Sequence, residues 1–319
     1  MTLATTRLRL AALLVVVASS GCGPGPYNRA AAAYGKATEA SATAIAQAPA
    51  TADRVCRRKA RLAYLQTRLG LLETPAPIGW NDWYAGAKAT EKQTWAQHCA
   101  DLAASGKVFG AALGALRQYA SALQSLASTG QYDGADLKTF ADGAAQIAAA
   151  LESAEAAAAA KPAGNLVAKF ATFLLDDVTE DQLEDYTRRA DPLVQPLVES
   201  LERYVESLEA QVSAAESFQR DTLRGLEVRS GLEGPDPADP AKLLAFHAFA
   251  LISEEEITET RAKLAGYRSV LKRVRVAHTA MVKAGAAGDE LEIKKALGSI
   301  FELATELQAL GTAAASSKE

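Results

Sequence analysis

Residues 192–217 read "PLVQPLVESLERYVESLEAQVSAAES", and this stretch holds the clearest repeat in the chain. Its apolar residues recur at alternating spacings of four and three, at Val194, Val198, Leu201, Val205, Leu208, Val212 and Ala215. This is the heptad pattern by which one α-helix packs against another. The stretch therefore predicts a long helix with one buried seam.

Charged residues beside this seam predict its partner. An acidic stripe follows the seam and consists of Glu199, Glu202, Glu206 and Glu209. A basic stripe on a second helix, beyond the linker "SGLEGPDPADP", consists of Arg261, Arg268, Lys272 and Arg275. The short linker predicts an antiparallel hairpin, and an antiparallel hairpin brings the two stripes together.

The linker also predicts a register. With the turn centred near Gly234, we expect three ion pairs, namely Arg261 with Glu209, Arg268 with Glu202, and Lys272 with Glu199. Exposed pairs contribute only about 0–1 kcal/mol each, so they specify the register more than they stabilise it. The alternative is that the basic stripe binds anionic headgroups or lipopolysaccharide phosphates.

The composition extends the helical prediction to the whole chain of 319 residues. Hydrophobic residues make up 49% of the chain and are rich in alanine, whereas aromatic residues make up 6%. Alanine is the best helix former, and the alternating pattern of β-strands between tight turns is absent. We therefore expect an all-α protein, an elongated multi-helix bundle of long antiparallel hairpins.

Glycine, proline and polar clusters divide the chain. Helices are expected at about 28–72 with a kink at Pro49, and at about 88–127, 135–161, 166–175, 180–189, 192–229, 240–284 and 290–310. Asp191 before Pro192 resembles a helix N-cap followed by a first-turn proline. We expect the bundle to cover 28–310, with a subdivision near 162–191 as one option, and 311–319 to form a disordered tail.

The chain begins with a basic and then apolar segment. Arg7 and Arg9 precede an apolar run at 10–18, which is too short to span a bilayer as a helix. Small residues then lead to Cys22. This segment resembles a bacterial lipoprotein signal, although Ser19 stands where leucine is commoner.

The resemblance implies that residues 1–21 are removed as a signal peptide and that Cys22 is lipidated. Residues 22–27 would form the anchor and a tether. Gly23 lacks the aspartate that marks inner-membrane retention in enterobacteria, so we expect an outer-membrane lipoprotein facing the periplasm. The alternative is ordinary secretion to the periplasm, which would leave Cys22 free.

The two other cysteines fall opposite each other in the first predicted hairpin. Antiparallel pairing around Gly79 places Cys56 within three residues of the position facing Cys99. In an oxidising compartment such a pair favours a disulfide. The alternatives are free thiols or a metal site with His98, but zinc requires three or four ligands at recognisable spacing. We expect no metal.

Small residues repeat on the next helix, where Gly106, Gly110 and Gly114 lie four residues apart. Each glycine in a helix costs about 1 kcal/mol relative to alanine, so something must offset the cost. We expect close packing against a neighbouring helix. A flexible hinge and membrane insertion are the alternatives, and Lys107 argues against insertion.

Aromatic residues gather in the loop of the first hairpin, where Trp80, Trp83 and Tyr84 lie in "ETPAPIGWNDWYAG". Exposed at a loop, such residues form a partner-binding hot spot. Folded back, they close the end of the bundle instead. Both interpretations remain open from the sequence, and these three residues are the best candidate interaction site.

No catalytic motif is present in the sequence. There is no phosphate-binding glycine loop, nucleophile elbow or zinc-binding motif, and His98, His247 and His278 are isolated from one another. The net charge of −4 argues against nucleic-acid binding, because proteins that bind nucleic acids are usually basic.

We therefore expect a non-enzymatic, lipid-anchored envelope protein without a cofactor. It would act through protein–protein contacts as a scaffold, adaptor or assembly factor, with the membrane and an envelope protein as partners. A toxin-immunity or inhibitor-type binding lipoprotein is the alternative. A helical hydrolase, with a site assembled from distant residues, is a third option.

Overall fold

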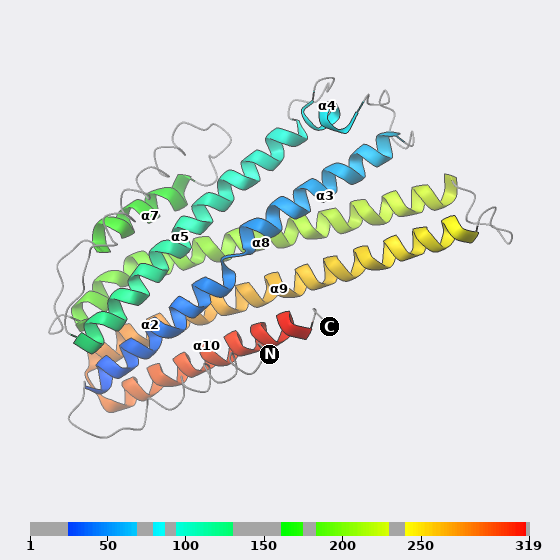
Figure 1. Cartoon of the computed structure of the whole chain (residues 1–319). Helices are drawn as coiled ribbons and strands as arrows, with labels where there is room; N and C mark the ends of the chain where they lie inside the picture. Colours follow the sequence, from blue (N-terminus) through cyan, green and yellow to red (C-terminus); the bar gives the residue numbers. More distant parts are fainter. Residues whose placement is uncertain are drawn as a thin grey trace. The chain divides into compact units, whose positions relative to one another are not determined.

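The computed structural model describes residues 25–68, 79–86, 94–129, 161–174, 183–229 and 240–316 (Figure 1). All regular structure within these ranges is helical, so the predicted all-α bundle is confirmed. The chain divides into two compact units. Unit 1 comprises Met1–Ala46, Val108–Arg203 and Gly266–Glu319, and unit 2 comprises Gln47–Lys107 and Tyr204–Ala265.

The division into units follows the long helices rather than a linker. Three helices contribute residues to both units, namely α5 (Trp95–Thr129), α8 (Leu183–Arg229) and α9 (Pro240–Ala287). The sequence suggested a subdivision near 162–191, where proline and glycine are frequent. Within the described residues, one boundary lies at residues 46–47, in the turn just before Pro49, and the other three lie inside these long helices.

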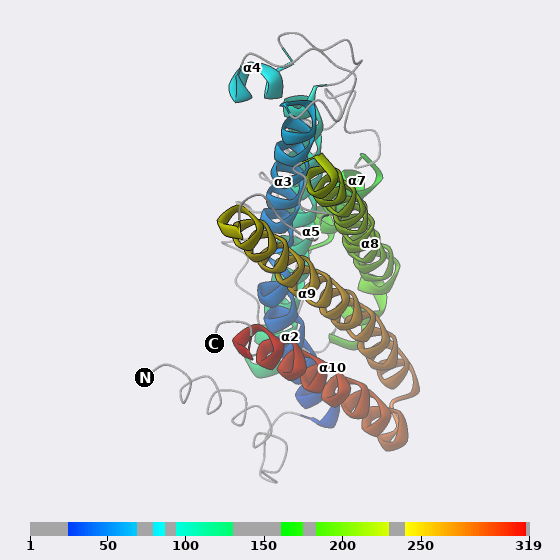
Figure 2. The ribbon, with the colours of Figure 1, turned by 90° about the vertical axis from the view of Figure 1, so that its right-hand side faces the viewer.

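Unit 1 also contains α2 (Pro26–Ile45), α7 (Lys161–Leu174) and α10 (Glu290–Ser316). Helices α2 and α10 lie side by side in both views (Figures 1 and 2). Gly35 of α2 permits close approach to α5, because a Cβ atom there would lie 2.5 Å from the Ala120 carbonyl oxygen. The largest fully buried side chains of this core include Tyr34, Leu116, Tyr119, Leu123, Phe170, Tyr186 and Leu197.

Unit 2 also contains α3 (Ala48–Arg68) and the short α4 (Trp80–Tyr84). The chain breaks between α2 and α3 just before Pro49, as predicted, because proline fits the first turn of a helix but not its interior. The apolar seam of α8 is buried along its whole predicted length, through both units. The core of unit 2 includes the seam residues from Val205 onward and the buried side chains of Ala52, Ala60, Leu62, Ile257 and Leu264.

Helix α8 differs from the prediction at its start. It runs without interruption from Leu183 through Pro192 and Pro196, so Asp191 is not an N-cap and the separate helix at 180–189 is wrong. A proline inside a helix removes one backbone hydrogen bond and costs about 3 kcal/mol. Buried residues lie on both sides of the two prolines, with Tyr186 and Ala190 before them and the seam residues Val198 and Leu201 after them, and their packing offsets this cost.

The other helix ends show smaller differences. Helix α7 begins at Lys161, where "KPAGN" was expected to end a helix, because Pro162 falls in its first turn. Helix α10 continues to Ser316 through most of the predicted disordered tail, since this segment is alanine-rich. The predicted helix at 135–161 lies almost wholly outside the described residues. The predicted break before α10 is present, with Gly288 at a positive φ of 61°.

Candidate functional site

Five aromatic side chains form one cluster in unit 2, which we call the tryptophan cluster. Its members are Tyr64 of α3, Trp80, Trp83 and Tyr84 of α4, and Trp95 at the start of α5. The Tyr64 ring centroid lies 5.6 Å from those of both Trp80 and Trp83. Trp80 stacks on Tyr84 at 5.1 Å, and Trp83 stacks on Trp95 at 6.3 Å. The cluster contains all three tryptophans of the chain.

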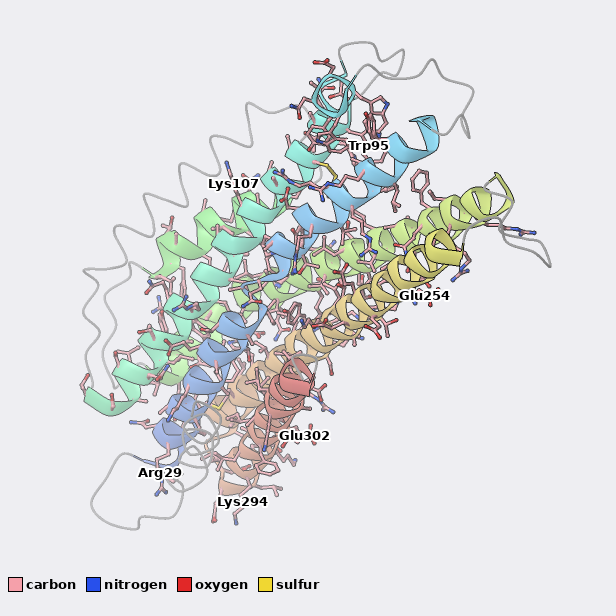
Figure 3. All side chains as sticks on the ribbon, turned by 45° about the vertical axis from the view of Figure 1, so that its right-hand side comes forward. Arg29, Trp95, Lys107, Glu254, Lys294 and Glu302 are labelled. Carbon is pink, nitrogen blue, oxygen red and sulfur yellow. A yellow bond between two sulfur atoms is a disulfide. The ribbon has the colours of Figure 1, made fainter. Side chains whose placement is uncertain are left out.

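The predicted disulfide is present and lies next to this cluster. Cys56 of α3 and Cys99 of α5 are joined, with their Cα atoms 5.7 Å apart (Figure 3). Trp95 lies one helical turn before Cys99, and Lys59 lies one turn after Cys56, so both share the face of the disulfide. The Lys59 ammonium nitrogen is 6.0 Å from the centroid of the Trp95 ring. The disulfide thus fixes the two helices that carry the edges of the cluster.

The aromatic rings of the cluster are neither fully buried nor free in solvent. Trp80, Trp83 and Tyr84 are half-buried, and no residue of α4 is buried. Asn81 and Asp82, between the tryptophans, are exposed. The rings therefore pack against one another, as a plug would, and still leave part of their surface exposed.

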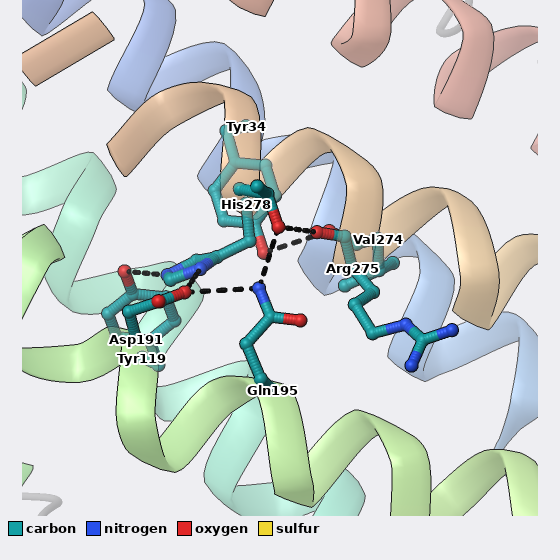
Figure 4. A network of polar contacts seen from close by, with 8 residues as sticks. Tyr34, Tyr119, Asp191, Gln195, Val274, Arg275 and His278 are labelled. Atoms are coloured by element: carbon teal, nitrogen blue, oxygen red, sulfur yellow. Dashed lines mark hydrogen bonds and ion pairs between the residues drawn. The ribbon is translucent and has the colours of Figure 1, made fainter. Parts of the chain in front are cut away.

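A second polar constellation lies inside unit 1 and centres on His278 of α9 (Figure 4). The Tyr119 hydroxyl lies 2.9 Å from His278 Nε2, and Asp191 Oδ1 lies 3.1 Å from His278 Nδ1. Gln195 donates from Nε2 to Asp191 Oδ1 at 3.0 Å and to Thr279 Oγ1 at 2.9 Å. These five side chains, from α5, α8 and α9, form one connected network.

A carboxylate, an imidazole and a hydroxyl in series also occur where enzymes activate a nucleophile. Here both His278 and Tyr119 have no exposed surface, which leaves a substrate no access to the hydroxyl. Burial raises the pKa of Tyr119 well above its usual range, so the hydroxyl stays protonated. Burial also lowers the pKa of His278, so the neutral imidazole is favoured. The network therefore joins three helices, and its buried hydroxyl and imidazole are not accessible to a substrate.

Sequence analysis missed this network for two reasons. Its members are far apart in the chain, and Asp191 was interpreted as a helix N-cap. A signal was available at His278, which lies seven residues after Leu271 on the buried face of α9. A buried histidine needs hydrogen-bond partners. No pattern in the sequence selects Tyr119 and Asp191 as those partners.

The charge pairs between α8 and α9 form, but with different partners from those predicted. In unit 2, Arg261 contacts Glu216 rather than Glu209. In unit 1, Arg275 Nε lies 3.4 Å from Glu202 Oε1, where Arg268 was expected. Each observed partner lies seven residues beyond the predicted one, which is one heptad, so the same helix faces meet in a shifted register.

In the third predicted pair, Glu199 was expected to contact Lys272, but it contacts a residue of its own helix. Glu199 lies 3.6 Å from Arg203 of its own helix, one turn away. The alignment of the described parts of α8 and α9 is therefore shifted from the predicted one. A heptad repeat by itself allows this slip, because moving by seven residues restores the same seam.

The glycine prediction holds at one position and fails at another. A Cβ atom on Gly106 would lie 3.0 Å from Pro49 Cβ and 3.3 Å from the Tyr204 hydroxyl, so helices of unit 2 do approach closely there. Gly110 is exposed, and a Cβ atom there would meet no described atom within 4 Å. Gly114 is half-buried on the same helix.

Two sequence predictions concern residues that the structure does not describe. Cys22, the predicted lipidation site, lies outside the described residues. His247 belongs to the part of α9 whose side chains are not described. Among the side chains that are described, no group of three or more His, Cys, Asp or Glu residues is placed to hold a metal ion.

Comparison with known proteins identifies no relative, since no family model, curated protein or solved structure matches the chain. Helix α5 is the one described helix long and apolar enough to cross a membrane by length and composition alone. The core helix of a soluble protein passes the same test, and Leu116, Tyr119 and Leu123 of α5 are fully buried inside the protein.

Proposed function

We propose that this chain is a lipid-anchored protein of the bacterial envelope that acts, without catalysis, by binding a partner protein through the tryptophan cluster. The observation that carries the proposal is the gathering of all three tryptophans in one half-buried cluster beside a disulfide. Tryptophan, tyrosine and arginine are the residues that dominate binding energy at protein interfaces.

The geometry of the cluster supports binding in two ways. The stacked rings are held at their edges by Tyr64 and Trp95, so little conformational entropy is lost when a partner docks. The disulfide between the flanking helices further limits their motion. A rigid and partly exposed aromatic surface of this kind suits a scaffold, adaptor or assembly factor.

The location in the envelope follows from the resemblance of residues 1–22 to a lipoprotein signal, and the disulfide agrees with an oxidising compartment. We place the protein at the outer membrane, facing the periplasm, with Cys22 as the membrane anchor. Intact mass measurement on protein from native membranes tests this placement. Loss of residues 1–21 with acylation at Cys22 supports it, and an unmodified mass contradicts it.

Site-directed photo-crosslinking tests the binding function. A benzoylphenylalanine at the exposed Asn81 is expected to capture one partner of defined mass in the native envelope. The same residue at the exposed Gln308 of α10 serves as the control and is expected to capture none. Trp80→Ala should lower the yield at Asn81, because loss of a hot-spot residue weakens binding about 30-fold. Equal adducts from both positions, or none from Asn81, would contradict the proposal.

A further inference from the structure

Helix α3 carries a dense basic cluster in a chain whose net charge is −4. Between Asp53 and Arg61 the sequence has five basic residues and one acidic residue. Such a concentration of charge on one helix requires a partner of opposite sign or full exposure to solvent. The contacts of each side chain in the structure decide between these two cases.

Two of the five basic side chains are used within unit 2. Arg58 donates to Glu256 at 2.6 Å and to Gln219 at 2.8 Å, and its side chain is only 24% exposed. Lys59 lies over the Trp95 ring. These two residues hold α3 against its neighbours. The contacts of the other three basic residues are described next.

The remaining three arginines form what we call the basic face, which consists of Arg54, Arg57 and Arg61. Spacings of three and four residues place them on one side of the helix, and all three are exposed. Arg57 has one acidic contact, with Asp53 on the same helix, and its side chain is still 60% exposed. An exposed ion pair within one helix contributes little stability, so Arg57 can leave Asp53 and bind another anion.

The basic face continues into the tryptophan cluster. Tyr64 lies three residues beyond Arg61 on the same side of α3, and its ring contacts Trp80 and Trp83. Arginines and amphipathic aromatic rings therefore adjoin each other without a break along one surface of unit 2.

We propose that the basic face and the adjoining tryptophan cluster bind the anionic phospholipid headgroups of a bilayer surface. Guanidinium groups match phosphate oxygens with two parallel hydrogen bonds, and tryptophan and tyrosine rings prefer the depth of the headgroups. The alternating spacing along one helix suits a flat anionic surface. A bilayer is also the partner that the predicted anchor at Cys22 brings within reach, and a lipid chain with a basic patch is a common pair of membrane signals. The bilayer is thus a second partner of this surface beside the protein partner proposed above, and the vesicle assay and the crosslinking at Asn81 test the two separately.

Vesicle binding tests the proposal on the full mature chain, residues 22–319, with Cys22→Ser to prevent acylation. The probes are vesicles of phosphatidylcholine alone and of phosphatidylcholine with phosphatidylglycerol in a two-to-one ratio. Because all three tryptophans lie in the cluster, their emission reports on this site directly. We expect a blue shift with the anionic vesicles only, reversed by high salt.

A charge-matched control separates the basic face from general attraction. Each basic residue near an anionic surface contributes about fivefold to partitioning, so R54Q/R57Q/R61Q should weaken binding roughly 100-fold. The triple variant K36Q/K169Q/K294Q changes the net charge equally, at exposed lysines of unit 1, and should bind as the wild type does. Circular dichroism checks that both variants are folded.

Two outcomes would overturn the proposal, namely no binding to anionic vesicles and equal weakening by both triple variants. If the wild-type chain does not bind vesicles and the arginine variant also loses the crosslinked protein partner, the basic face is assigned to an acidic protein surface instead.

Discussion

The buried imidazole of His278 should make the protein lose stability as the pH falls below about 6.5. The perturbation is His278→Gln, because glutamine stays neutral at both pH values and keeps one hydrogen-bond donor and one acceptor. It can therefore replace part of the bonding to Tyr119 and Asp191 while removing the titrating group.

The sign and size of the effect follow from the burial of His278. Burial lowers the pKa of His278 in the folded protein below its ordinary value of 6.5, whereas the unfolded chain keeps that value. Below pH 6.5 the unfolded state binds a proton that the folded state does not, so stability present at neutral pH is lost as the pH falls. If the folded imidazole stays neutral, the loss reaches about 2 kcal/mol at about pH 5.

Asp191 contributes in a different pH range. The hydrogen bond from His278 lowers the pKa of Asp191 below its ordinary value of 3.8, so its contribution is lost only in more acidic solution. The interval between about pH 6.5 and pH 5 therefore isolates the histidine.

Urea unfolding followed by circular dichroism at about pH 7 and about pH 5 measures the effect in both proteins. We expect His278→Gln to be less stable than the wild type at the higher pH, because the network is only partly replaced. We also expect its loss of stability on acidification to be smaller than that of the wild type, by up to about 2 kcal/mol. The reasoning is refuted if both proteins lose the same free energy between the two pH values.

Four other perturbations test the packing by equilibrium unfolding. Tyr119→Phe leaves a buried imidazole nitrogen without its partner and should cost about 1–3 kcal/mol, and a smaller loss would mean that water replaces the hydroxyl. Replacing Cys56 and Cys99 by alanine should cost about 2–4 kcal/mol, and an unchanged transition midpoint would show that the cross-link is not formed in solution. Gly110→Ala should stabilise the protein by roughly 1 kcal/mol, because no described atom lies within 4 Å of the added methyl group and alanine is the better helix former. Gly106→Ala should destabilise it, because overpacking costs about 1–3 kcal/mol, and a gain at both glycines would contradict the close approach.

Much of the fold could be predicted because its signals are local. The α8 seam from Val194 to Ala215 appears directly in the spacing of apolar residues, and every member is buried. The pairing of Cys56 with Cys99 followed from the length of one hairpin. Breaks at Pro49 and Gly288 followed from the backbone preferences of proline and glycine.

The rest depended on packing between distant segments. Pro192 and Pro196 disfavour a helix locally. The helix continues through them because the residues around them are buried. The register of α8 against α9 slipped by one heptad because the repeat itself satisfies both alignments. The partners of His278 lie on two other helices, so no sequence window contains them.

The partition of unit 2 into two internal segments has a consequence for how such a protein changes over evolutionary time. Residues 47–107 and 204–265 each form an interior stretch of the gene, flanked on both sides by residues of unit 1. A shorter descendant that kept only unit 1 would lose two separate internal coding segments, and both ends of the gene would remain. Its alignment to this chain would show two gaps, and a search that assumes contiguous domains would recognise neither half. For the same reason, a truncation from either terminus removes part of unit 1 before it reaches unit 2.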